Sequence, residues 1–331
     1  MDPRYKLILI LPYFGKFNNY FPLYLDSCRF NPTINWLIFT DDKRDFNYPR
    51  NVRVIYLSFK DFRDRIQQKF DFKISLSDPY RLCNFRPAFG EIFNKYIRDY
   101  DFWGYCDSDM IWGDIRRFIT DDILNKYNKI HELGHMSLIR NSKYYNELYK
   151  YNDAYKIAFS ENYNLLFFDE HGFNDIFRVN EDNIYRHKSI ADFNPRKYNF
   201  RLNEGCTKND ISNANHIYTW EAGNLLRYYV KGNKILTEDV LYIHFLKRKM
   251  KVSAESNAEN FAIIPNEIVK LNGFEFTPEN IIEISQNRFY KEYWTSIFTI
   301  NSLRSKLIYR VIIEPKRKIT FNKIRTKIHL V

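Results

Sequence analysis

The chain has 331 residues, of which 45% are apolar and 18% aromatic, so it can bury the core of one large domain or of a domain with an appendage. Its four cysteines are far apart and show no zinc-binding spacing, which favours reduced thiols in a cytoplasmic protein. The first apolar run is interrupted by Pro12 and is too short to span a membrane, and the N-terminus lacks the cleavage pattern of a signal peptide. These features exclude a disulfide-rich secreted domain and an integral membrane protein.

The net charge of +11 is concentrated at the end of the chain. The segment from Arg288 to Val331 holds eleven Lys or Arg and two Glu, which accounts for +9 of this charge. A basic tail on a nearly neutral body indicates an anionic surface as partner, either a membrane or a nucleic acid.

The N-terminal part has the pattern of an α/β domain. Apolar runs at 5–11, 35–40 and 52–58 predict buried strands, and apolar residues at helical spacing predict a helix over 17–29. Strands of this type, alternating with a helix, are typical of a mainly parallel sheet.

Further elements follow in the middle of the chain. Apolar spacing after Pro87 predicts a helix to residue 99, and 102–106 (FWGYC) predicts a strand, after which Asp114 can cap a short helix. Further β segments are expected at 135–140, 183–187, 217–220 and 225–229, with a hairpin around Gly223, while 165–168 suits either a strand or a short helix. Residues 280–331 predict two or three basic helices.

Asp107 and Asp109 follow directly on the apolar segment 102–106. In open α/β sheets ligands bind beyond the carboxyl ends of the strands, so two acids at this point can converge on one site. Mg²⁺ and Mn²⁺ prefer oxygen ligands and leave positions open for phosphate oxygens. The pattern therefore predicts a site for a metal ion and a diphosphate, although a solvated turn after a strand would give the same pattern.

His244 ends another apolar run, and Lys247 follows three residues later. A neutral imidazole can complete a metal site and an ammonium group can neutralise a diphosphate. A buried structural histidine beside a solvated basic stretch is the alternative.

Six blocks in order resemble a known family of enzymes. They are LPYFGKFNNYF, LIFTDD, LCNFRPAFGEIF, FWGYCDSDMIWGDI, HMSLIRN and FDEHGF, which lie between about residues 5 and 265. Together they are similar to metal-dependent GT-A glycosyltransferases, and most closely to bacterial glycosyltransferases of polysaccharide-synthesis clusters.

The resemblance implies a GT-A-like fold, with a mainly parallel central sheet flanked by helices, a small β-containing acceptor region and a helical C-terminal extension. It implies a catalytic domain over 1–270, with 271–331 as a basic helical extension. The implied reaction is hexosyl transfer from a nucleotide-diphosphate donor, expected to be a UDP-sugar, to a glycan or polyprenyl-linked acceptor in surface polysaccharide synthesis.

The resemblance also implies roles for individual residues. Asp107 would face the metal or the ribose, while Asp109 and His244 would bind Mn²⁺ or Mg²⁺ and Lys247 would contact the diphosphate. Nucleotide and donor contacts are implied for Pro12, Tyr13, Phe14, Gly15, Asp41, Asp42, Arg81 and Arg86. Asn84 stands where relatives are expected to carry an acid, which puts any donor contact at that position in doubt. The same residues could instead form turns, caps and surface ion pairs, with Arg81 and Arg86 paired to Asp78 and Glu91.

Asp169 and Glu170 follow a further apolar run and are the candidates for a catalytic base that deprotonates the acceptor hydroxyl. A retaining enzyme needs no such base, and a capped turn with a surface acid pair is the structural alternative.

The basic tail interleaves cations with aromatic side chains, which suits an anionic membrane surface. No nucleic-acid module is recognisable, so no nucleic-acid partner is expected, and a charged helical cap is the structural alternative. We expect a cytoplasmic protein, peripheral at the inner face of the plasma membrane. Two other functions stay open: a nucleotidyltransferase or phosphotransferase using the same acids, and a non-enzymatic protein that binds anionic lipid or nucleic acid.

Overall fold

The computed structural model describes residues 3–160, 167–193, 200–203, 215–246, 248–254, 259–286 and 314–329. The strands are β1 (Leu7–Tyr13), β2 (Ile34–Thr40), β3 (Val52–Tyr56), β4 (Phe102–Cys106), β5 (Met110–Trp112), β6 (Lys129–Leu133), β7 (Met136–Arg140), β8 (Ile184–Tyr185), β9 (Ile190–Asp192), β10 (His216–Glu221), β11 (Asn224–Lys231), β12 (Lys234–Asp239), β13 (Tyr242–His244), β14 (Lys251–Val252), β15 (Asn260–Ile264) and β16 (Glu267–Lys270). The α-helices are α1 (Phe21–Arg29), α2 (Phe59–Gln67), α3 (Leu82–Phe85), α4 (Phe89–Ile92), α5 (Asn94–Ile97), α6 (Ile115–Phe118), α7 (Asp121–Lys126), α8 (Lys143–Glu147), α9 (Ala154–Ser160), α10 (Gly172–Asn180), α11 (Pro278–Ser285) and α13 (Glu314–Ile328).

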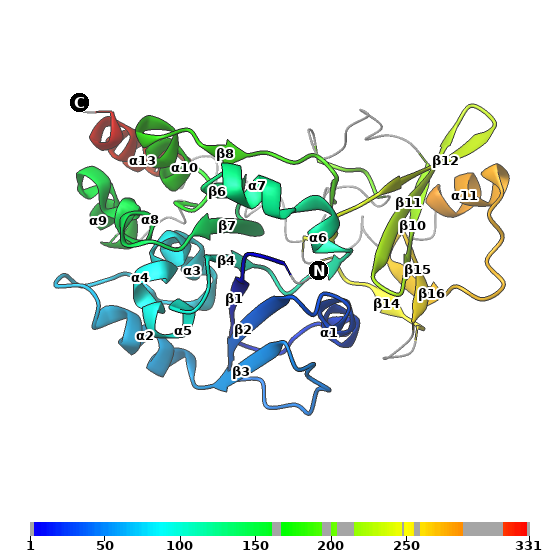
Figure 1. The fold of residues 1–331 in the computed structure, drawn as a ribbon, viewed down its shortest axis with the longest axis horizontal. Helices are drawn as coiled ribbons and strands as arrows, with labels where there is room; N and C mark the ends of the chain where they lie inside the picture. Colours follow the sequence, from blue (N-terminus) through cyan, green and yellow to red (C-terminus); the bar gives the residue numbers. More distant parts are fainter. Residues whose placement is uncertain are drawn as a thin grey trace.

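The main sheet has the strand order β3-β2-β1-β4-β7-β6-β8 (Figure 1). Neighbouring strands are parallel except where β7 pairs antiparallel with β4 and with β6. The predicted α/β class, with a mainly parallel sheet flanked by helices, is confirmed.

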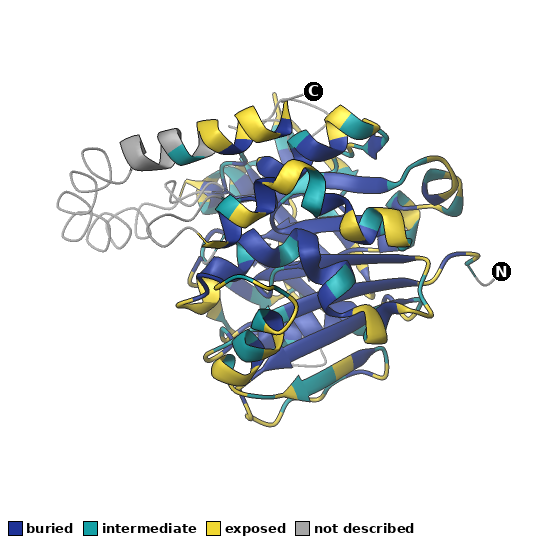
Figure 2. Cartoon of the chain, turned by 90° about the vertical axis from the view of Figure 1, so that its left-hand side faces the viewer, coloured by how far each residue is buried: buried dark blue, intermediate teal, exposed yellow. Residues whose placement is uncertain are grey.

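The central strand β1 is apolar throughout because both faces of the sheet are covered. Its alternate residues Leu7, Leu9 and Leu11 pack in one cluster with α1, while Ile8 and Ile10 pack in another with α2 to α5, α9 and α10. Figure 2 shows the buried strands between helices whose outer sides are exposed.

A second sheet lies beside the main one and has the order β12-β11-β10-β15-β16-β14 (Figure 1). The predicted hairpin around Gly223 joins β10 to β11, with positive φ at Ala222 and Gly223, a geometry suited to a two-residue turn. A third, small sheet has the order β5-β13-β9. Some residues of its strands pack in the core of the main sheet and others in the core of the second sheet, so it joins the two.

The C-terminal helix α13 packs back on α9 and α10. Ile324 and Ile328, one turn apart, are both fully buried in the core cluster that also contains Ile8 and Ile10. Lys323, Arg325 and Lys327 on the same helix are exposed. Among the described residues, no helix combines the length and apolarity that a membrane span requires.

Several predicted element boundaries differ from those observed; for example, α1 begins at Phe21 rather than at residue 17, and β3 ends at Tyr56 rather than at residue 58. β1 continues through Pro12 to Tyr13: its pairing with β4 stops at Ile10, but its pairing with β2 runs on to Tyr13. The helix predicted after Pro87 is divided into α4 and α5 at Phe93, whose ψ of 21° is not helical. Phe89, Phe93 and Ile97, spaced four residues apart, all pack in the core despite the break.

Some predicted segments lie only partly in the described residues. Of 165–168 only Phe167 and Phe168 are described. Of the predicted basic helices beyond residue 280, α13 is basic, but α11 contains two glutamates and no Lys or Arg; residues 287–313 lie outside the description.

Candidate active site

The strand β4 carries the acidic pair to the edge of the main sheet. All five residues of β4 are buried, and the chain leaves the sheet at Asp107, whose backbone N–H donates to the carbonyl of His135 (3.0 Å). After Ser108, Asp109 leads directly into β5. Because β1 and β4 are parallel, their carboxyl ends meet at this edge, where ligands bind in sheets of this kind.

The small sheet brings His244 to the same point. In this sheet His244, at the end of β13, pairs with Met110 of β5 on one side and with Asp192 of β9 on the other. The next residue, Phe245, donates its backbone N–H to the carbonyl of Asp109 (2.9 Å). The histidine is therefore held beside the acidic pair by backbone pairing rather than by its side chain alone.

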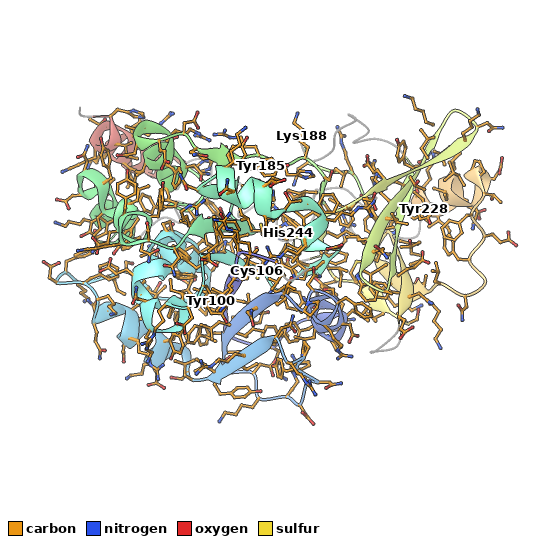
Figure 3. All side chains as sticks on the ribbon, viewed as in Figure 1. Tyr100, Cys106, Tyr185, Lys188, Tyr228 and His244 are labelled. Atoms are coloured by element: carbon orange, nitrogen blue, oxygen red, sulfur yellow. The ribbon has the colours of Figure 1, made fainter. Side chains whose placement is uncertain are left out.

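The three predicted metal ligands converge. Nε2 of His244 lies 3.6 Å from Oδ2 of Asp107 and 3.6 Å from Oδ1 of Asp109, and one ligand atom from each residue lies within 4.8 Å of the others. Figure 3 shows His244 in the middle of the molecule, close to Cys106 at the end of β4. Two carboxylates and an imidazole are a donor set that suits Mn²⁺ or Mg²⁺.

The electrostatics of this cluster favour a cation. Burial alone would lower the pKa of His244, but the carboxylates of Asp109, Asp107 and Asp192 raise it to about 10. Burial would likewise raise the pKa of Asp107, but the positive charges of Arg86 and His244 hold it well below its usual value. The carboxylates around His244 thus stabilise a positive charge at this point.

Arg86 connects this cluster to the second predicted acidic pair. Its Nη2 pairs with Oδ1 of Asp107, and its Nη1 lies 3.1 Å from Oδ2 of Asp169. Nη1 also donates to the carbonyl of Gly134. The alternative in which Arg86 pairs with Glu91 on the surface is wrong, because the guanidinium is largely buried between Asp107 and Asp169.

A cavity of about 740 Å³ opens beside the acidic pair. Arg86, Asp107, Ser108 and Asp109 form one side of it, together with residues of the loop after β1. The full lining is Leu11, Pro12, Tyr13, Phe14, Lys16, Asn18, Asn19, Tyr20, Pro79, Tyr80, Leu82, Cys83, Arg86, Asp107, Ser108, Asp109, Arg248, Lys249 and Met250.

In the loop predicted to hold the nucleotide, the first three residues line the cavity and Gly15 does not. Pro12, Tyr13 and Phe14 line the cavity, and the ring of Tyr13 stacks on Phe17 at 4.5 Å between centroids. Gly15, with a φ of +107°, turns the chain away and donates its N–H to Oδ1 of Asp41 (2.7 Å). A side chain at this φ would strain the backbone, so the turn requires glycine.

Other predicted donor contacts lie outside the cavity lining. Asp41 holds the turn at Gly15, and the buried Asp42 accepts the N–H of Phe17 (2.9 Å) while pairing with Arg44. Arg81 is buried, and its Nε donates to the carbonyl of Ser75 (3.0 Å). Lys247 lies outside the described residues.

The two candidate bases have different environments. Asp169 is 1% exposed, and burial raises its pKa to about 7; its oxygens accept from Arg86 and from the backbone N–H of Glu170. Glu170 is partly exposed, and burial raises its pKa as well. Its carboxylate accepts from the backbone N–H of Gly134 and lies against that glycine, where a Cβ atom would come within 2.2 Å of Oε1.

Asn84, where an acid was expected, has a structural role. Its Oδ1 accepts the N–H of Phe168 (3.3 Å) and its Nδ2 donates to the carbonyl of Ala158 (3.4 Å). The amide thus ties the segment before Asp169 to α9.

Sequence reasoning missed several residues that the fold brings to this place. Arg248 and Lys249 line the cavity, and the basic stretch after His244 was a signal that could have found them. Asp192 accepts a hydrogen bond from Nδ1 of His244 at 2.7 Å, but nothing in the sequence around it distinguishes it from other acids.

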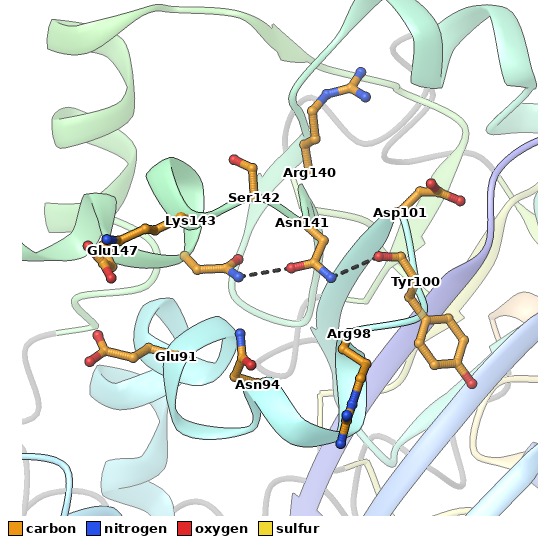
Figure 4. Close-up of a pocket in the computed structure, with 11 residues that line it drawn as sticks. Glu91, Asn94, Arg98, Tyr100, Asp101, Arg140, Asn141, Ser142, Lys143 and Glu147 are labelled. Carbon is orange, nitrogen blue, oxygen red and sulfur yellow. Dashed lines mark hydrogen bonds between the residues drawn. The ribbon is translucent and has the colours of Figure 1, made fainter.

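Another cavity, of about 730 Å³, lies at the opposite end of β4 (Figure 4). Its lining mixes cations such as Arg98 and Lys143 with anions such as Glu91 and Glu147. Two of its amides are hydrogen-bonded within the protein, since Asn146 donates to Asn141 (2.8 Å) and Asn141 to the carbonyl of Tyr100 (2.8 Å). None of the predicted site residues lines this cavity.

Residues 9–272 match the model of a family of unknown function, DUF6625. The chain belongs to this family. A search of the curated proteins found no match. Because the function of the family is not established, the activity implied by the sequence resemblance is taken up below as a proposal.

Solved structures of several glycosyltransferases are similar to part of the chain. The galactosyltransferase LgtC, in complex with donor and acceptor sugar analogues, is 15% identical over 56% of this chain and 75% of its own, with a TM-score of 0.33. GlyE of Streptococcus pneumoniae TIGR4 is 12% identical over 57% of this chain and 46% of its own, with a TM-score of 0.31. Mouse xyloside xylosyltransferase 1 is 12% identical over 57% of this chain and 87% of its own, with a TM-score of 0.32. Similarities this low do not support a shared function, so the proposal below rests on the residues of this chain.

Proposed function

We propose that this protein is a metal-dependent glycosyltransferase of the hexosyltransferase class. It would move a sugar from a nucleotide-diphosphate donor to a glycan or polyprenyl-linked acceptor in surface polysaccharide synthesis. The donor that we propose is a UDP-hexose. The observation that carries the proposal is the convergence of Asp107, Asp109 and His244 beside a cavity of about 740 Å³ at the carboxyl ends of β1 and β4.

A divalent ion, Mn²⁺ or Mg²⁺, would be held by Asp107, Asp109 and His244 and would supply positive charge for a departing diphosphate. Arg86, Arg248 and Lys249 add cationic side chains to the same cavity, which favours an anionic ligand. Lys247, in the same basic stretch, is proposed as a further diphosphate contact.

The wall formed by Pro12, Tyr13 and Phe14 is proposed to bind the nucleoside. Tyr13 and Tyr20 offer aromatic surface there, and Asn18 and Asn19 offer amide groups for a base. Asp41 and Asp42 would act through the loop they hold, by fixing Gly15 and Phe17, and Arg81 would act through its contact with Ser75.

Glu170 is the stronger of the two candidates for the base that deprotonates the acceptor hydroxyl. It is partly exposed, while Asp169 is buried and its two oxygens accept from Arg86 and from Glu170. Burial raises the pKa of Glu170, which makes its carboxylate a better proton acceptor.

The proposed catalytic domain spans 1–270 and the proposed extension 271–331. The extension contains α13, which is anchored on the domain by Ile324 and Ile328 and exposes Lys323 and Lys327. Exposed cations of this kind would add attraction to an anionic inner membrane leaflet, where a lipid-linked acceptor would be found.

A thermal-shift experiment with a panel of nucleotides tests the proposed function. UDP is expected to raise the unfolding temperature when Mn²⁺ is present and much less in EDTA, since a ligand stabilises the state that binds it. A preference for nucleoside triphosphates would indicate a nucleotidyltransferase or phosphotransferase. No response to any nucleotide, with or without Mn²⁺, would contradict the proposal.

A further inference from the structure

Asp192 lies directly behind His244, on the side away from the acidic pair. Oδ1 of Asp192 lies 2.7 Å from Nδ1 of His244, while Nε2 of the same ring lies 3.6 Å from an oxygen of Asp107 and of Asp109. The ring therefore has one nitrogen toward each set of carboxylates.

The backbone fixes this arrangement. Asp192 and His244 are partners in the parallel pairing of β9 with β13, and Phe193 donates its N–H to the carbonyl of His244 (3.1 Å). Both side chains are buried, with 8% of Asp192 and 5% of His244 exposed. A buried, register-fixed pair leaves the imidazole little freedom to rotate.

Asn203 holds the second oxygen of Asp192. Its Nδ2 donates to Oδ2 of Asp192 (2.6 Å), and its backbone N–H donates to the carbonyl of the same residue (2.9 Å). With Oδ2 occupied in this way, Oδ1 is aimed at His244. The net charge of the carboxylate is retained, because Asn203 is neutral.

We propose that Asp192, oriented by Asn203, is the positioning residue of His244: it accepts a hydrogen bond from Nδ1–H, so that Nε2, once it has lost its proton, presents its lone pair to a metal ion held with Asp107 and Asp109. This inference rests on the proposed function, since it assigns a role toward the same metal. A carboxylate behind a metal-binding histidine fixes the tautomer and orientation of the ring and strengthens it as a ligand.

His135 limits the motion of the ring from a third side. Its imidazole stacks on His244 with 4.3 Å between centroids and 20° between planes. His244 is thus confined by Asp192 in its plane and by His135 on its face.

Mn²⁺ binding without nucleotide, measured by electron paramagnetic resonance on protein labelled with ¹⁵N-histidine, tests this role. Wild type is expected to bind Mn²⁺ with a ¹⁵N hyperfine coupling that His244→Ala abolishes. Asp192→Ala should weaken Mn²⁺ binding by about 10- to 100-fold and reduce the coupling. Asp192→Asn keeps an oxygen acceptor without the charge, so its Mn²⁺ affinity should lie between those of wild type and Asp192→Ala.

The controls separate positioning from folding. Asp26→Ala removes a carboxylate on α1 that is buried to a similar degree, with 4% exposed, and should leave Mn²⁺ affinity within about twofold of wild type. The unfolding temperature in EDTA shows whether each variant folds; if Asp192→Ala does not, Asp192→Asn and Asn203→Ala carry the test, both with a smaller loss of affinity than His244→Ala.

Two outcomes overturn the inference, and they differ. If wild type binds Mn²⁺ through His244 and the Asp192 variants bind it equally well with the same ¹⁵N coupling, Asp192 does not position the ligand and the proposed function stands. If wild type shows no coupling to His244, the proposed metal site fails and the inference fails with it.

Discussion

Nη1 of Arg86 lies 3.1 Å from Oδ2 of Asp169, in an ion pair from which water is largely excluded. The same guanidinium pairs with Asp107, so one cation joins the candidate metal site to the acidic pair at the end of the FDE segment. This relationship gives Asp169 and Glu170 different tasks, although they are adjacent in the sequence.

Glu170→Gln is therefore expected to lower kcat by about 10²- to 10⁴-fold, the usual loss when a general base is removed. Asp169→Asn should lower it less, because Asp169 supports Arg86 and does not reach an acceptor. Steady-state kinetics of UDP release with a fixed acceptor would measure both. Equal loss in the two variants, or a larger loss in Asp169→Asn, would contradict the assignment.

Gly134 is expected to be needed for the position of Glu170. A methyl group at this residue would come within 2.2 Å of Oε1 and 2.9 Å of Cδ of Glu170, so the flexible side chain must move. Gly134→Ala should lower kcat by up to about 100-fold through this displacement, with little change in unfolding temperature. Combined with Glu170→Gln, it should cause no further loss; a full additional loss in the double variant would show that the two residues act independently.

Gly104 is expected to be essential for the main sheet rather than for the reaction. A Cβ atom on this residue of β4 would lie 2.0 Å from the carbonyl oxygen of Ser137 on the neighbouring β7, and neither backbone can yield freely. Gly104→Ala should reduce the free energy of unfolding by about 3 kcal/mol or more, the upper part of the overpacking range. Urea denaturation measures the change. Gly232→Ala, where the added Cβ has nothing within 4 Å but φ is +61°, reports the cost of backbone strain alone and should destabilise less. Equal effects of the two would contradict the steric argument.

Lys129 should make stability depend on pH. Its ammonium group is fully buried, with Nζ 4.6 Å from the ring centroid of Phe173, and burial lowers its pKa to about 7. Between pH 7 and about 10.5 the unfolded chain binds a proton at Lys129 that the folded protein does not, so the free energy of unfolding should rise as pH rises through this window.

Urea denaturation at several pH values would test the Lys129 prediction. The rise should be smaller in Lys129→Met than in wild type, and the exposed Lys126→Met should keep the wild-type slope. Identical slopes in all three proteins would show that Lys129 does not cause the pH dependence.

Local patterns predicted most of the main sheet. The bounds of β4 and the capping of α6 by Asp114, which accepts the N–H of Arg117, agree with expectation because apolar runs and caps are local properties. The meeting of Asp107, Asp109 and His244 was also predicted, since acids and a histidine at the ends of apolar runs are visible in the sequence.

What could not be predicted depends on pairing between distant segments. The β5-β13-β9 sheet is built from strands of three residues, too short to show a period, and its order is set by tertiary contacts. Asp192 is placed behind His244 only by that sheet, and Arg86 between Asp107 and Asp169 only by the packing of the segment around α3. Contacts that depend on tertiary packing of this kind leave no pattern in the spacing of residues along the sequence.

Anomalous diffraction from crystals grown with Mn²⁺ and UDP tests the central claim most directly. The account predicts an anomalous peak bounded by Asp107, Asp109 and Nε2 of His244, with the diphosphate in the cavity lined by Arg86 and Lys249, and loss of that peak in Asp109→Asn. A bound UDP with no anomalous peak among these three residues, or a peak that persists unchanged in Asp109→Asn, would contradict it.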